Sequence, residues 1–229
     1  MAIETMSDAG LRENVVLDPA NSSNWDQVGQ AFIRERALPE AARCFSRASL
    51  LDRNDFSALM RLAMTQELAG DLAVAAENYL RCARSLSGDA AAKALYRAVG
   101  CFQKLEDFKS IVNITSDQVS GNWGDYQGMN ETVAAAYLFC GDPIRGAEWI
   151  FGAPPEKDQD PGYRRTLGQI LSAAEKSADF ESVCGLLSAI GTSLFQSGIR
   201  ARKFVLWISN LFPDARFEQL IAQSGLVHL

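Results

Sequence analysis

The residue types that most often carry out catalysis are sparse in this chain. Its 229 residues include one histidine, His228. A Ser-His-Asp triad, a Cys-His pair or a histidine-ligated metal would all have to use that residue. Two pairs of carboxylates, Asp158 with Asp160 and Glu131 with Asp125, have the chemistry for acid and base work, but such groups in polar loops are usually solvated. We therefore expect no catalytic site, no metal and no cofactor.

The cysteines predict reduced thiols rather than cross-links or metal ligands. There are five of them, without a C-x-x-C pair, at positions 44, 82, 101, 140 and 184. An odd number with this spacing argues against both a disulfide framework and a zinc site. We expect them to be small core residues.

Composition excludes further classes of protein. The 28 acidic residues outnumber the 22 basic ones and give a net charge of −6, the opposite of the basic surface expected of a nucleic-acid binder. Residues 1–14 contain acids and no apolar core, unlike a secretory signal. No apolar run approaches the ~18 residues of a membrane-spanning helix. The expectation is a soluble, cytoplasmic protein.

A short turn recurs along the chain and indicates its organisation. The sequence LDPAN at residues 17–21 returns as LDRND at residues 51–55, with Asp52 lying 34 positions after Asp18. Between residues 24 and 110 the apolar residues recur at steps of three and four, which predicts helices and requires no strand.

The segment after the first turn predicts two helices that pack face to face. Each helix has one apolar stripe: Trp25, Val28, Gly29 and Phe32 in the first, and Ala41, Phe45 and Ala48 in the second. The small residues let the two backbones approach, while the aromatic rings fill the space around them.

This order of large and small residues resembles the tetratricopeptide repeat. That repeat has 34 residues and the pattern W-x-x-L-G-x-x-Y, then A-x-x-x-F, then a closing proline. Here Val28 and Phe32 replace the leucine and the tyrosine, and Arg53 replaces the proline. The resemblance implies an all-α fold in which helix-turn-helix units stack into a right-handed α-solenoid.

Further copies of the pattern cover most of the chain, strongly up to residue 89 and in degenerate form after about residue 110. Counting from three residues before each stripe places the starts of the units at residues 22, 56, 92, 127 and 164. We expect three regions: a partial repeat or cap at 1–21, a repeat array at 22–197 and capping helices at 198–229. The alternative is that residues 110–229 form a separate helical domain.

Three segments depart from the pattern. The loops at 120–128 and 153–162 interrupt the array and are expected to be flexible joints. The segment FVLWISNLF at 204–212 carries Val205 and Phe212 outside its main stripe, and the end of an array normally needs a polar cap. We expect its second face to pack against residues 225–229 or against another subunit, so a homo-oligomer is possible.

The resemblance also implies where a partner would bind. In tetratricopeptide arrays the first helix of each unit lines an inner groove that holds extended peptides or a partner's helix. The residues expected to face this groove are Met60, Arg61, Met64, Glu67, Lys93, Tyr96, Arg97, Lys104 and Arg165.

Some relatives use this groove to hold the terminal carboxylate of a chaperone peptide. Lys93 and Arg97 match the last two residues of that carboxylate clamp, whereas Asp26, Gln30 and Arg61 replace its earlier lysine and asparagines. We expect Arg61, Lys93 and Arg97 to form a basic strip for an acidic or carboxylate-ending peptide. The alternative is that they are scattered, solvated charges.

Two classes of function follow from the resemblance. The first is a non-enzymatic adaptor, scaffold or chaperone that presents a groove to a protein partner. The second is the substrate-recognition arm of a larger enzyme, similar to the repeat arrays of protein glycosyltransferases. A longer gene product, or a neighbouring gene for a transferase, would separate them.

Overall fold

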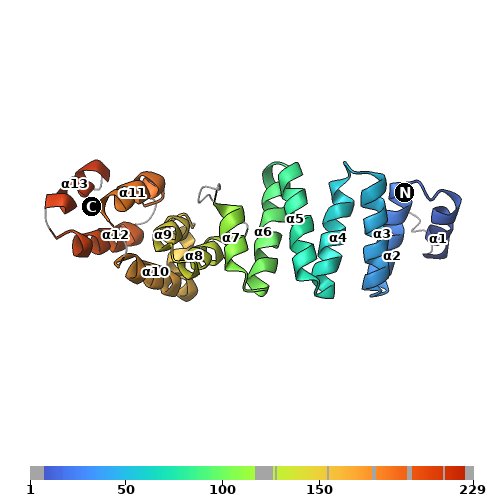
Figure 1. Cartoon of the computed structure of the whole chain (residues 1–229), viewed down its shortest axis with the longest axis horizontal. Helices are drawn as coiled ribbons and strands as arrows, with labels where there is room; N and C mark the ends of the chain where they lie inside the picture. Colours follow the sequence, from blue (N-terminus) through green and yellow to red (C-terminus); the bar gives the residue numbers. More distant parts are fainter. Residues whose placement is uncertain are drawn as a thin grey trace. The chain divides into compact units, whose positions relative to one another are not determined.

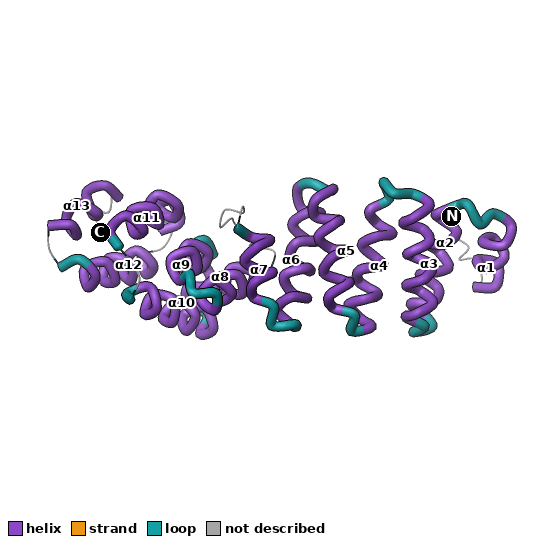
Figure 2. The backbone as a smooth tube through the Cα atoms, viewed as in Figure 1, coloured by secondary structure: helices purple, strands orange, loops and turns teal. Residues whose placement is uncertain are grey.

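The chain is built from helices. The computed structural model describes residues 8–116, 126, 128–153, 155–176, 179–194, 198–213 and 215–224, and within these ranges every regular element is a helix and none is a strand (Figure 2). The chain divides into two compact units, residues 1–106 and residues 107–229, which we call unit 1 and unit 2.

Unit 1 is a row of antiparallel helices. Its elements are α1 (Asp8–Leu17), α2 (Ser22–Arg34), α3 (Leu38–Leu51), α4 (Phe56–Ala69), α5 (Leu72–Ser85) and α6 (Gly88–Lys104). Figure 1 shows α2 to α6 side by side, and within unit 1 each of these helices packs against its neighbours in the chain. The pairs α2/α3 and α4/α5 have the order of first and second helices that the repeat implies.

Turn residues fix where these helices begin and end. The Asn21 side chain accepts a hydrogen bond from the Ser23 amide at 3.0 Å, and Asp55 caps α4 through the Ser57 amide at 2.9 Å. Such caps satisfy amides that lack a partner in the first helical turn. Gly70 ends α4 with φ at +89°, a conformation that glycine adopts without strain.

The α2/α3 pair packs through the small residue that the sequence indicated. A Cβ atom added to Gly29 would lie 2.7 Å from Cε1 of the fully buried Phe45 ring. Ala41 and Ala48, on the opposite helix, are also completely buried. The two backbones are therefore close enough that residue 29 has no room for a side chain.

Trp25 departs from the expectation that its ring fills the space between the two helices of the first pair. Its ring is half-buried against a cluster that includes Leu11 and Val28, and its Nε1 donates to the Pro19 carbonyl at 2.8 Å. The fully buried aromatic residue of this pair is Phe45. Trp25 instead links α2 to the preceding turn and to α1.

The cores of the following helices use alanine and cysteine beside larger residues. One cluster joins Phe45 to Leu59, Leu62 and Ala94, and the next surrounds the buried Tyr79 with alanines from α4, α5 and α6. Cys82 and Cys101 belong to these clusters, as the sequence predicted, but Cys140 is exposed, so the expectation of a core residue is wrong there.

Unit 2 continues with shorter helices. Its elements are α7 (Phe108–Thr115), α8 (Met129–Phe139), α9 (Pro143–Phe151), the 3-10 helix η1 (Pro155–Gln159), α10 (Pro161–Ala174), α11 (Phe180–Leu194), α12 (Gly198–Leu211) and α13 (Ala215–Ser224). Trp149, Phe151, Tyr163 and Phe204 are its largest fully buried side chains. Gly146 approaches the Ala134 carbonyl so closely that an added Cβ would lie 3.0 Å from it.

The observed helix starts depart from the regular spacing of the predicted units. The first helices α2 and α4 begin at Ser22 and Phe56, but α6 begins at Gly88, four residues before the predicted start of 92. Its extra turn, GDAAAK, is rich in alanine, the residue with the highest helix propensity. The division into repeat units stays a prediction, and the boundary between the two compact units falls inside the predicted third repeat.

The segment expected to be a flexible joint at 153–162 contains η1. Lys157 Nζ lies 3.2 Å from Glu131 Oε1, and Asp158 is buried. Asp160 caps α10 by accepting the amides of Gly162 and Tyr163. Glu131 and Asp158 are therefore covered structural groups and not the solvated residues that we expected, whereas the Asp160 side chain stays 45% exposed. Asp125 and most of the loop at 120–128 lie outside the described residues.

The second apolar face of α12 is partly covered from within the chain. The Phe212 ring packs edge-on against Phe180 of α11, with 5.7 Å between ring centroids, and the Arg216 guanidinium lies 5.1 Å from the Phe212 ring centre. Residues 225–229, which we expected to cover this face, lie outside the described part of the chain.

Candidate functional site

The predicted groove residues lie on two helices of unit 1 and one of unit 2. We call the faces of α2, α4 and α6 that carry Asp26, Arg61, Glu67 and Arg97 the first-helix surface. Met60 is half-buried, because it packs against the clusters below α4, and Met64 is more exposed. Arg165 is an exposed residue of α10 in unit 2, so it is described apart from the others.

Three cations of the first-helix surface, Arg61, Arg97 and Lys104, are already paired with carboxylates. Arg61 Nη2 of α4 lies 3.4 Å from Asp26 Oδ2 of α2, so this ion pair joins the two helices. Glu67 binds two cations of α6, Lys104 at 2.7 Å and Arg97 at 3.4 Å. Both carboxylates are 13% exposed, whereas the cations are more open to solvent. Removing Arg61 would leave the mostly covered Asp26 without its cation, which is costly.

Glu67 is the centre of a small network. Burial alone would raise the pKa of its carboxyl, but hydrogen bonds from Lys104 and from the Tyr79 hydroxyl at 2.9 Å outweigh burial and hold the pKa below its ordinary value. Burial, followed by the hydrogen bond to Glu67, raises the pKa of Tyr79. The carboxylate is thus ionised at neutral pH and joins α4, α5 and α6.

The expected basic strip is therefore weaker than the sequence suggested. Arg61, Lys93, Arg97 and Lys104 supply four positive charges and Asp26 and Glu67 supply two negative ones, leaving two in excess (4 − 2). Lys93 is exposed and has no ion pair among the described residues.

The positions that depart from the carboxylate clamp are occupied by an internal contact. Gln30 Nε2 donates to Asp26 Oδ2 at 2.7 Å, and the same oxygen faces Arg61. A negative charge at Asp26, engaged in this way, would repel a terminal carboxylate at this place.

An apolar cavity of about 310 Å³ opens between α2 and α4, beside these charges. Its apolar wall consists of Ile33, Phe45, Met64 and Leu68, and its polar border of Gln30, Arg34, Arg61 and Thr65. Leu68, on this wall, is 67% exposed. Sequence reasoning found Arg61 and Met64 but missed Ile33 and Leu68, since both lie outside the core stripe.

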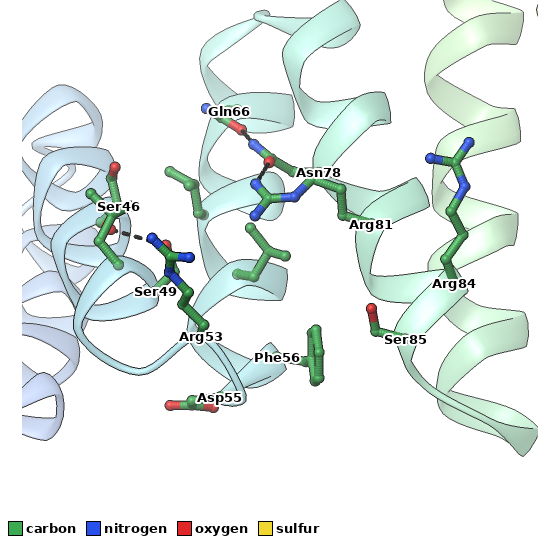
Figure 3. Close-up of a pocket in the computed structure, with 13 residues that line it drawn as sticks. Ser46, Ser49, Arg53, Asp55, Phe56, Gln66, Asn78, Arg81, Arg84 and Ser85 are labelled. Atoms are coloured by element: carbon green, nitrogen blue, oxygen red, sulfur yellow. Dashed lines mark hydrogen bonds between the residues drawn. The ribbon is translucent and has the colours of Figure 1, made fainter.

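A larger cavity, of about 690 Å³, lies on the opposite face of α4, between α3 and α5 (Figure 3). We call it the arginine cavity. Its lining residues are Ser46, Ser49, Leu50 and Arg53 around the end of α3, Asp55, Phe56, Leu59, Leu62 and Gln66 from the start and face of α4, and Asn78, Arg81, Arg84 and Ser85 from α5. Sequence reasoning missed it, because the resemblance pointed to the first helices alone. The available signal was the recurrence of arginine at 43, 47, 53, 81 and 84 on the second helices and the turn after α3.

The described residues contain no evident reaction centre. Among them, no three histidine, cysteine, aspartate or glutamate side chains gather closely enough to hold a metal ion. All five cysteines are described and none forms a disulfide, and burial raises the pKa of Cys82 and of Cys101 to about 11, which keeps these thiols protonated. None of the helices in the described part is long and apolar enough to cross a membrane.

Comparisons with known proteins agree with the fold. No family model matches the sequence, and no curated protein matches it. The crystal structure of YrrB, described as a TPR protein with an unusual peptide-binding site, superimposes with a TM-score of 0.52 at 10% identity, covering 96% of this chain and all of YrrB.

Two other solved structures align with lower scores. The Cut9 and Hcn1 hetero-tetramer of the APC/C gives a TM-score of 0.41 at 13% identity, over 94% of this chain and 45% of that one. PilF of Pseudomonas aeruginosa gives 0.41 at 14% identity, over 90% and 98%. The repeated helix pairs, their small-residue contacts and the similarity to YrrB together show that this chain has the helical repeat fold of a tetratricopeptide-repeat protein.

Proposed function

We propose that this protein is a non-enzymatic interaction module whose first-helix surface holds an extended peptide from a partner protein. The observation that carries the proposal is the apolar cavity between α2 and α4, with its exposed Leu68 and the neighbouring Met64. Exposed apolar side chains around a cavity of this size suit one hydrophobic side chain of a ligand.

The charges beside the cavity fit an extended peptide more than a single carboxylate. Asp26 and Glu67 neutralise part of the positive charge, so the attraction for an acidic ligand is modest. Arg34 borders the cavity and Lys93 lies exposed on α6, where both can donate to peptide carbonyl groups or to an acidic side chain. An apolar anchor residue supplies most of the affinity in this arrangement, and the cations orient the chain.

The cellular role that we propose is that of an adaptor, scaffold or chaperone in the cytoplasm. The absence of disulfides among the five cysteines, three of which are buried, supports a reducing compartment. The second candidate is a recognition arm of a larger enzyme such as a protein glycosyltransferase. A chain with this fold serves either role, and a longer gene product or a stable complex with a transferase would favour the second.

The test is a selection from a random peptide library displayed on phage, followed by fluorescence polarisation with the enriched peptides. We expect the enriched peptides to share an apolar residue and Leu68→Glu to weaken their binding more than about tenfold, since it puts a charge at the cavity wall. The matched control is Leu206→Glu, because Leu206 is a similarly exposed leucine of α12, at 64%. The proposal fails if no peptide is enriched, or if both variants weaken binding equally.

A further inference from the structure

We infer that the arginine cavity is a second interaction surface, one that takes an extended acidic segment of a partner protein. It lies on the side of α4 away from the first-helix surface. The mean direction of the lining residues at 59, 62 and 66 is turned by more than a quarter of a helical turn from that of residues 61, 64, 65 and 68, which line the apolar cavity. The inference is thus independent of the proposed peptide groove.

The cations of this cavity differ from those of the first-helix surface in having no carboxylate partner. Arg53 and Arg84 are exposed and make no ion pair within the described part of the chain. Arg81 donates to Asn78 Oδ1 at 3.1 Å, a neutral acceptor, while Asn78 donates to Gln66 at 2.8 Å. In a protein of net charge −6, unpaired arginines around one cavity make a local surface of opposite sign.

The single carboxylate among the lining residues does not neutralise them. Asp55 is the N-cap of α4, where it accepts hydrogen bonds from the amide and the hydroxyl of Ser57. The hydroxyl hydrogen bond, above all, lowers the pKa of the Asp55 carboxyl. Both hydrogen bonds go to Oδ1, and no arginine of the cavity forms an ion pair with this carboxylate among the described residues, so the guanidinium groups keep their donors for a ligand.

The floor of the cavity is apolar. The buried Leu59 and Leu62 line it beside the half-buried ring of Phe56, and Leu50 at its border is 61% exposed. Figure 3 places Phe56 between the α3 side and the α5 side. A ligand that pairs with the arginines can therefore also bury an apolar side chain, which raises affinity without a further charge.

The surface extends beyond this one cavity. A neighbouring cavity of about 410 Å³ shares Ser46, Leu50, Leu62 and Gln66 with it and adds Arg43 and Arg47 of α3. Both added arginines are exposed and have no ion pair among the described residues. The two cavities form a continuous lining with five arginines and Asp55 as its one acid.

The placement of the arginines favours an extended acidic segment over a single phosphate group. Figure 3 shows the guanidinium groups of Arg53, Arg81 and Arg84 at separate places around the cavity instead of converging on one point. A phosphate ion needs several donors at one position, whereas a peptide with acidic residues at intervals offers one carboxylate to each arginine. Arginine and carboxylate groups pair with two parallel hydrogen bonds, which adds specificity.

The experiment uses the full chain and a fluorescein-labelled peptide of about ten residues, ~33 Å when extended, with alternating glutamates, one leucine and one phenylalanine. The control peptide has glutamine in place of every glutamate. We expect the acidic probe to bind, and the combination Arg53→Gln with Arg84→Gln to weaken that binding more than about tenfold. Raising the salt concentration should weaken the unaltered protein more than this variant.

The matched control removes the same charge elsewhere. Lys176 and Arg202 are exposed residues of unit 2 without an ion pair among the described residues, and their joint change to glutamine should alter binding less than about twofold. Circular dichroism checks that both variants stay folded.

Three outcomes would overturn the inference. The first is equal binding of the acidic and the glutamine probe, and the second is equal weakening by the two variants, which would mean unspecific attraction. The third is a dimer in sedimentation velocity that the Arg53 and Arg84 variant abolishes, since the occupant would then be a second copy of this chain.

Discussion

Glu67 shows how single residues decide the character of the first-helix surface. Its carboxylate forms ion pairs with Lys104 and Arg97 and accepts a hydrogen bond from the Tyr79 hydroxyl. Because these cations are already paired, they attract an acidic ligand only weakly. Residue types alone could not reveal this, since a list of cations on one helical face does not state which acids lie opposite. Gly29, by contrast, was interpretable from the sequence because its spacing from Trp25 and Phe32 required a small residue.

Glu67→Gln should destabilise the protein by about 1 kcal/mol at pH 7, because a neutral amide pairs less strongly with Lys104 and Arg97, both of them well exposed. The folded state lowers the pKa of this carboxyl, so its stabilising contribution is present above the ordinary value of 4.5 and is lost as the pH falls through the folded value. Urea unfolding at pH 7 and at decreasing pH measures the difference. The gap between the two proteins should narrow in acid, and a constant gap would contradict the assignment.

Gly29→Ala should cost about 1–3 kcal/mol, because the added methyl group would lie 2.7 Å from the buried Phe45 ring and must displace it. Gly100→Ala is the matched control. Gly100 lies inside α6 with open space around its Cα, so alanine there should be neutral or stabilise by up to about 1 kcal/mol. Thermal unfolding followed by circular dichroism compares the two. Equal effects would show that the helices do not approach as closely as described.

At the scale of helices, most elements of unit 1 follow from local sequence signals. Asn21 and Asp55 mark helix starts, and Gly70 marks an end. The early start of α6 escaped prediction, since its alanine-rich first turn has no large apolar residue to reveal a stripe. The apolar cavity between α2 and α4 could be predicted in part, because Met64 lies on the groove side. The arginine cavity could not, because it forms from side chains of α3, α4 and α5 that no single periodicity connects.

Trp25 controls the attachment of α1 to α2. Trp25→Ala should cost about 2 kcal/mol, less than for a fully buried tryptophan, because the ring is half-buried in the cluster with Leu11. Trp25→Phe keeps much of the packing and loses the hydrogen bond to Pro19, at a cost of about 1 kcal/mol. Hydrogen exchange in residues 8–17 should rise strongly in the alanine variant. Unchanged exchange there would show that α1 is held by other contacts.

At the scale of the whole molecule, the chain consists of two compact units with separate cores. The repeat period did not indicate the boundary after Glu106, since degenerate copies of the pattern run through it. Local unfolding of a repeat protein depends on the contacts within each repeat and on those with the repeats next to it. Gly29→Ala should therefore raise hydrogen exchange in α2 to α5 and leave α8 to α10 unchanged. A uniform rise over both units would show that they open together.

The ion pairs between successive first helices also have a consequence for evolution. Asp26 on α2 and Arg61 on α4 are 35 positions apart and each is the other's counter-charge, as Glu67 is for Lys104 on α6. A change at one member leaves a covered charge behind unless the other member changes too. Among natural variants of this protein, positions 26 and 61 are therefore expected to covary, as are positions 67 and 104, whereas Arg53 and Arg84 have no partner within the described chain and would instead covary with residues of the protein they bind.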